Sequence, residues 1–67
     1  MIEVKSNGDG TYSVYENGVL SQKARLKSIK QNYIEHNRNG RTEYSLTDQE
    51  ATVIDSNGDS HARIKIQ

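Results

Sequence analysis

The segment 55–59 reads Asp-Ser-Asn-Gly-Asp and places oxygen ligands at alternate positions, as the first half of a calcium-binding loop does. The match ends there, because Ser60 stands where an EF-hand loop needs glycine and Ile66 stands where it needs a bidentate glutamate. Turn asparagines and aspartates also bond their own backbone without any metal. We therefore expect segment 55–59 to be a turn, and we expect no metal or other cofactor.

The two histidines, His36 and His61, are the next candidates for chemistry. If they met across a sheet, with Glu35 or Asp59 beside them, they could form a zinc site or an acid–base pair. Two histidines without a third specified ligand are a weak metal signature, and no spacing singles out a serine as a nucleophile. The glycines belong to turn sequences and not to a phosphate-binding loop. The sequence thus predicts a protein that is not an enzyme.

Positive charge is unevenly distributed in the middle of the chain. No acidic residue lies between Glu16 and Glu35. The basic residues of this interval are Lys23, Arg25, Lys27 and Lys30. Such a cluster could bind phosphates, and Tyr33 nearby could stack on a base. The alternative to phosphate binding is a solvent-exposed face that lies opposite the acidic segment 43–59 of the same chain or of a neighbour. Nucleic-acid binding through the basic segment 23–30 is therefore an alternative function.

Asn-Gly pairs mark the turns that must position these residues. They are Asn7-Gly8, Asn17-Gly18, Asn39-Gly40 and Asn57-Gly58. Asn-Gly accepts the positive φ angles that a type I′ turn needs, and this turn joins antiparallel strands. Between the turns, apolar residues alternate with polar ones, as in strands with one buried face. We expect hairpins 2–5 with 11–16, 33–36 with 42–46, and 51–55 with 61–66, a third strand at 19–20 and a polar connector at 47–50.

The segment around 21–33 fits two structures. As a helix it would place Leu26, Ile29 and Tyr33 on one apolar stripe, and its helix-forming residues favour that interpretation. As a strand it would alternate apolar and basic side chains, and the surrounding β pattern favours that one. The predicted fold is therefore a single small domain, 1–67, that is mainly β, with antiparallel hairpins joined by Asn-Gly turns and a central helix left open.

Composition sets limits on stability and on partners. The 67 residues are 31% hydrophobic, contain no cysteine and carry no net charge. Disulfides and thiolate metal sites are thus excluded, and no global charge attracts nucleic acid or acidic lipid. No apolar run is long enough to span a membrane and no signal peptide is evident, so a cytoplasmic location is the default expectation. A chain this small buries a thin core and often needs a partner copy.

Open sheet edges suggest where such a partner would bind. The last strand ends in Ile64 and Ile66, which either pack inward or pair with another chain at the sheet edge. We expect a binding or assembly module that acts through a sheet face or edge, with a protein partner or a second copy forming a homo-oligomer. Segment 53–66 resembles the strand–Asn-Gly–strand pieces of phage tail and fibre proteins, which suggests a small viral or mobile-element protein.

Overall fold

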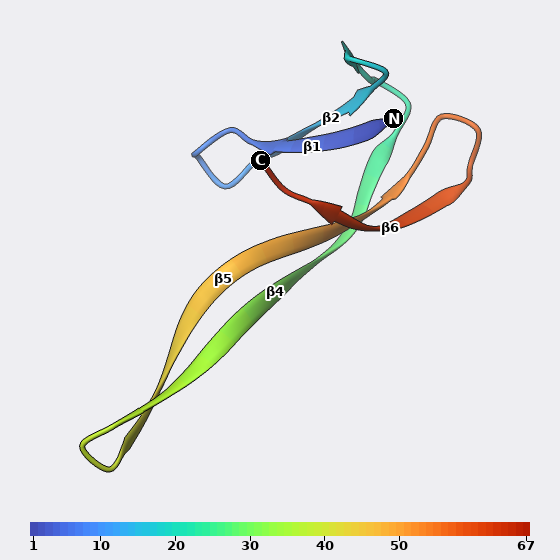
Figure 1. Cartoon of the computed structure of the whole chain (residues 1–67). Coiled ribbons are helices and arrows are strands. Elements are labelled where there is room, and N and C mark those ends of the chain that lie inside the picture. The colour runs from blue at the N-terminus through green and yellow to red at the C-terminus, as the bar shows by residue number, and fades with distance from the viewer.

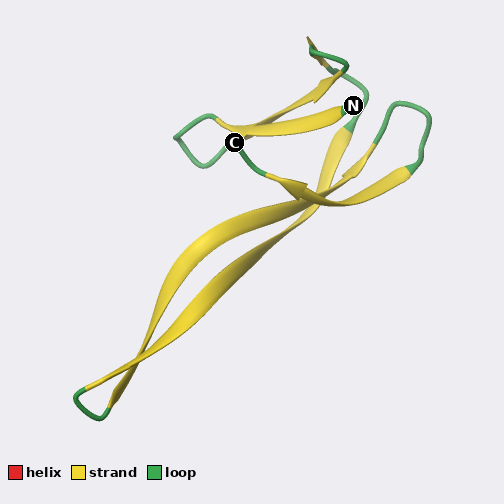
Figure 2. Ribbon diagram, viewed as in Figure 1, coloured by secondary structure: helices red, strands yellow, loops and turns green.

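All 67 residues are described by a computed structural model, in which the chain forms six strands and no helix (Figures 1 and 2). The strands are β1 (Ile2–Ser6), β2 (Tyr12–Glu16), β3 (Val19–Leu20), β4 (Arg25–Arg38), β5 (Arg41–Ile54) and β6 (Ser60–Lys65). All neighbouring strands within each sheet are antiparallel. The predicted β class is confirmed. No helix of the kind that could span a lipid bilayer is present.

The helix alternative for 21–33 is wrong, because most of that segment belongs to β4. A β-bulge explains the helix-like spacing of Leu26 and Ile29. Lys27 is an extra residue in β4, so Leu26 lies opposite Val53 while Ile29 lies opposite Ala51. Both apolar residues therefore share the inner face of the sheet although they are three positions apart. Pairing with β5 along the whole of β4 overrides the local helix preference.

Two of the four Asn-Gly pairs form the expected tight turns. Both central residues have positive φ at Asn17-Gly18 (52° and 83°) and at Asn39-Gly40 (52° and 76°), as a type I′ turn requires. At Gly8 and Gly58 only the glycine has positive φ, so these hairpins close through wider loops. The type I′ prediction is wrong for those two loops, whose asparagines are not in the left-handed region.

The six strands form two sheets that meet at a small core. One sheet has the order β1-β2-β3 and the other β4-β5-β6. Val4 and Val14 of the first sheet pack against Ala51 and Val53 of the second, and these four are the only buried residues. At the C-terminus, Ile66 forms a parallel bridge to Val4, and thus joins the sheets through the backbone as well.

Strands β4 and β5 continue far beyond this core as a two-stranded ribbon (Figure 1). We call residues 33–46 the distal arm; every residue from Tyr33 to Thr47 is exposed. The chain measures 50 × 23 × 16 Å as a result. A second bulge, at Thr47, separates the arm from the rest of the sheet, and the Thr47 hydroxyl donates to the Asn32 carbonyl at 3.0 Å. The predicted polar connector 47–50 is wrong, because these residues lie within β5.

The core generates the first prediction. Val53→Ala removes packing from a side chain with no exposed surface, and should lower the free energy of unfolding by about 2 kcal/mol. In a domain of this size that corresponds to a melting temperature roughly 10 °C lower. Val19→Ala makes the same change at a side chain that is 68% exposed, and should cost less than about 0.5 kcal/mol. Thermal unfolding followed by circular dichroism measures both, and equal effects would contradict this core.

Candidate functional site

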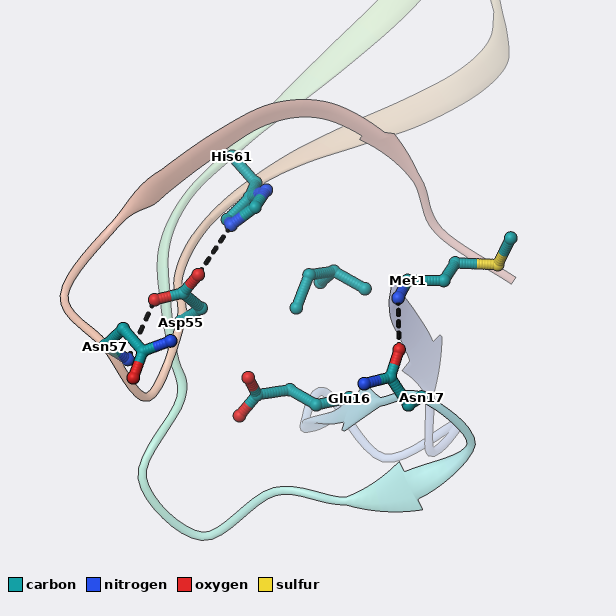
Figure 3. Close-up of a pocket in the computed structure, with 7 residues that line it drawn as sticks. Met1, Glu16, Asn17, Asp55, Asn57 and His61 are labelled. Atoms are coloured by element: carbon teal, nitrogen blue, oxygen red, sulfur yellow. Dashed lines mark hydrogen bonds and ion pairs between the residues drawn. The ribbon is translucent and has the colours of Figure 1, made fainter.

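A hollow of about 290 Å³ lies where the turn that joins β5 to β6 faces the first sheet (Figure 3). Its lining is mostly polar and comes from both sheets. The lining residues are Met1, Ile2, Glu16, Asn17, Asp55, Asn57 and His61. Since it contains an aspartate, a glutamate and a histidine, it is the first place to look for chemistry.

Asp55 and His61 form the central contact of the hollow. The Nε2 atom of His61 lies 2.8 Å from Oδ2 of Asp55, and the other carboxylate oxygen accepts the backbone N–H groups of Asn57 and Asp59 at 2.9 Å each (Figure 3). The His61 hydrogen bond, with further help from these backbone donors, holds the pKa of Asp55 below its usual value. Asp55 therefore closes the loop between β5 and β6, which is a structural task.

The histidine–aspartate pair resembles the base and orienting acid of a hydrolase, but a nucleophile is not placed against it. Two serines close to the hollow form hydrogen bonds with a different carboxylate. Ser21 and Ser56 donate to Glu16 at 2.6 and 3.1 Å. The Ser21 bond in particular holds the pKa of Glu16 below its usual value. Because Ser56 and Glu16 belong to different halves of the chain, this contact fastens the two sheets together.

The two histidines do not meet. His36 lies opposite Glu43 near the end of the distal arm, whereas His61 lies opposite Val53 beside the core. Positions 43 and 53 are ten residues apart on β5, or about 33 Å at the rise of an extended strand. The zinc or acid–base pairing considered from the sequence is thus excluded within one chain. No group of three or more metal-binding side chains is formed anywhere in the structure.

A charged network occupies the outer face at the base of the arm. Lys65 of β6 bonds Asp48 at 2.5 Å and lies 3.5 Å from Glu50, and the Asn32 amide donates to both carboxylates at 2.7 and 3.2 Å. The Lys65 and Asn32 bonds lower the pKa of Asp48, and the Asp48 carboxylate raises the pKa of Lys65. These contacts hold β6 and β4 on either side of β5.

The basic segment is exposed but is not gathered with its tyrosine. Its four basic side chains, Lys23, Arg25, Lys27 and Lys30, are all exposed. Lys30 lies directly opposite Glu50, so an acidic residue of the same chain faces it, as in the alternative of a solvent-exposed face opposite segment 43–59. Lys30 and Tyr33 are three positions apart in an unbulged part of β4, and therefore point to opposite faces. A nucleotide whose phosphate is bound by Lys30 could therefore not stack its base on Tyr33.

Ile64 and Ile66 pack inward, which was one of the two alternatives for them. Both are partly buried against the core cluster, and Ile64 lies opposite Ala51. The backbone N–H of Ile66 donates to the carbonyl of Gln49 at 3.1 Å. The terminal strand thus completes its own chain's core, and the apolar surface available to a partner lies elsewhere.

The distal arm exposes a group of large apolar side chains. Tyr33 and Leu46 are opposite each other, Tyr44 is the next residue along the same face, and their exposed fractions are 55%, 52% and 66%. The only binding role predicted for Tyr33 was stacking on a base, and the sequence analysis assigned no binding role to Tyr44 or Leu46. The available signal was the alternation of Thr42, Tyr44 and Leu46, which predicts one face but cannot tell whether the same chain covers it.

Comparison with protein families, with curated proteins and with solved structures finds no significant match to this chain. The viral or mobile-element origin suggested by segment 53–66 therefore stays a prediction. Arguments about function rest on the geometry described above.

The hydrogen bonds of Asp55 with His61, Asn57 and Asp59, which we call the Asp55 clamp, lead to a prediction about pH. Because the pKa of Asp55 is lowered by folding, the clamp stabilises the native state above the unfolded value of about 3.9, and that stability is lost as the pH falls through the lowered pKa. Asp55→Asn should lower the melting temperature at pH 7 and reduce the decline of stability below about pH 4. Asp59→Asn is the matched control, since only the backbone of Asp59 takes part in the loop bonds. Parallel pH profiles for wild type and Asp55→Asn would contradict the clamp.

Proposed function

We propose that this protein is a non-enzymatic binding or assembly module whose contact surface is the distal arm. The observation that supports the proposal is the apolar face formed by Tyr33, Tyr44 and Leu46, half or more of whose surface is exposed. Large apolar side chains gathered on a projecting element mark interaction sites more often than isolated exposed ones do.

The cost of leaving this face uncovered strengthens the argument. An isolated two-stranded ribbon is at best marginally stable in water, and the arm has no third strand and no second layer beneath it. Because these three side chains are already partly covered, burying the rest of each would contribute roughly 1–2 kcal/mol. A partner laid along the arm would therefore stabilise both the complex and the arm.

The arm also offers unpaired backbone. β4 is an edge strand along its whole length, and β6 pairs with β5 only from Glu50 to Ile54, so both edges of the arm are free. Free edges accept an added strand, with backbone hydrogen bonds supplying affinity. The residues at and near the tip carry charge and limit indiscriminate pairing: Glu35, Arg38, Arg41 and Glu43. The apolar face is thus the more selective contact surface.

Nucleic-acid binding is the second candidate. It is favoured by the exposed basic side chains Lys23, Arg25 and Lys27, none of which forms an ion pair, since the ion pairs of the structure involve only Lys65 and His61 as cations. It is disfavoured by the zero net charge and by the separation of Lys30 from Tyr33 across the ribbon.

Site-specific photocrosslinking in the cells that make the protein tests the main proposal. A photoreactive phenylalanine analogue in place of Tyr44 should form crosslinked products, whether with another copy or with a different macromolecule. The matched control places the same analogue at Val19, which is equally apolar and 68% exposed but belongs to the first sheet. Products confined to position 44 support the arm as the contact surface. Equal products at both positions, or products at Val19 alone, overturn it.

The nucleic-acid candidate predicts a salt-sensitive shift in the fluorescence anisotropy of labelled single- or double-stranded DNA. Reversing the charge at Lys23 and Lys27 should then abolish the shift and leave the circular dichroism spectrum unchanged. Lys5→Glu is the control for each single reversal, because it makes the same charge change as Lys23→Glu or Lys27→Glu on an exposed residue of the other sheet. Absence of any shift for the wild type at low ionic strength eliminates this candidate.

A further inference from the structure

We infer that the apolar face of the distal arm packs against the same face of a second copy of this chain, forming a two-fold dimer. The inference rests on the proposed function and names the partner for that surface. This face of β4 and β5 is the one that packs in the core at the Ile29/Ala51 pair. Further along the ribbon, the same face carries Tyr33 and Leu46.

The order of residues along this face suits a two-fold axis. Cross-strand pairs on the face run from Gln31/Gln49 at the base through Tyr33/Leu46 and Glu35/Tyr44 to Asn37/Thr42 near the tip. The outer pairs are polar and uncharged, and the two inner pairs contain the large apolar side chains. An axis between the inner pairs places the tip of each arm over the base of the other, so that polar pairs meet polar pairs and apolar pairs meet apolar pairs.

The contacts this packing creates are chemically complementary. Leu46 of each copy lies against the partner's Tyr44, and Tyr33 lies near the partner's Glu35. Glu35 is the only charged side chain on the four pairs and already accepts the Tyr44 hydroxyl at 3.4 Å, a long bond that leaves acceptor capacity. The Tyr33 hydroxyl of the second copy donates to its own Gln31 in the single chain, and in the dimer it would exchange that bond for one to Glu35. No like charges are forced together except the two Glu35 carboxylates, each with tyrosine hydroxyls beside it.

The opposite face of the arm does not suit the same packing. Its cross-strand pairs are Ile34/Ser45, His36/Glu43 and Arg38/Arg41. Two arginines directly opposite each other repel, and covering them together with the His36/Glu43 pair would remove charged groups from water. The face carries a single large apolar residue. Self-association is therefore expected through the apolar face of the distal arm and not through this opposite face.

The surface area of the chain agrees with one missing partner. A compact monomer of 7.6 kDa exposes about 4,300 Å², whereas this chain exposes 5151 Å². The excess is about 850 Å², close to the roughly 800 Å² that each partner buries in a standard stable interface. The radius of gyration, 14.9 Å, likewise exceeds the ~11 Å of a compact chain of this length. The projecting arm contributes to both differences, and the dimer would cover one of its two faces.

The test is the mass of the purified chain by light scattering after size exclusion, over a hundredfold dilution from about 100 μM. We expect twice the 7.6 kDa chain mass at the highest concentration, and a melting temperature that falls on dilution. Leu46→Glu should weaken the dimer at least about tenfold, because it places a new carboxylate beside Glu35 in the interface. Ile34→Glu makes the same type of change at a side chain of matching exposure, 50% against 52%, on the opposite face, and should leave the dimer intact.

A variant with a shortened arm provides a second test that does not depend on the folding of the substituted arms. Deleting 33–38 and 41–47 leaves Asn39-Gly40 as the turn between Asn32 and Asp48, which already pair. This chain should keep the spectrum of the two sheets and remain a monomer at every concentration. A monomeric wild type throughout, or a dimer that Ile34→Glu disrupts as much as Leu46→Glu, overturns the inference. If the wild type is monomeric while position 44 still crosslinks in cells, the arm binds a different partner and only the second-copy inference fails.

Discussion

The contact between the two sheets is the constraint on which the rest of the structure depends. Only four side chains are buried, and two of them, Ala51 and Val53, lie near the end of a 14-residue strand. The chain has too few apolar residues to build a longer core, so the sheets can meet only at that end of β5. The Ile66 bridge and the Glu16 contact with Ser56 join the two sheets there, beside the loop that Asp55 closes. The opposite half of the ribbon is left to project.

Hairpin positions could be predicted from the sequence because Asn-Gly specifies a local backbone geometry. The turns at Asn17-Gly18 and Asn39-Gly40 have the predicted geometry, whereas the wider loops at Asn7-Gly8 and Asn57-Gly58 show that the dipeptide marks the position of a turn without fixing its type. The segment 21–33 could not be assigned, because the Lys27 bulge shifts the alternation of apolar side chains and imitates the spacing of a helix. A bulge depends on how the partner strand pairs, and that is not encoded locally. The same holds for the polar stretch 47–50, whose side chains bond across strands.

The candidate site was harder to predict than the fold for a related reason. Charge and chemical reactivity drew attention to the basic segment and to the histidines, yet the structure separates both sets. Lys30 and Tyr33 point to opposite faces, and His36 and His61 lie at opposite ends of β5. The apolar face of the distal arm consists of residue types that are common in strands. It becomes notable only because no second layer of the same chain lies beneath it, which depends on where the short core ends.

The register of the arm also bears on how such a protein can change. Beyond the Thr47 bulge, β4 and β5 pair without interruption up to the Asn39-Gly40 turn, and none of these residues touches the core. Inserting or removing two residues on each strand would alter the reach of the ribbon by about 7 Å while each remaining side chain keeps its face. Length is thus separable from folding. A lineage could adjust the span or the partner of the arm by small paired insertions, with the junction of the sheets unchanged.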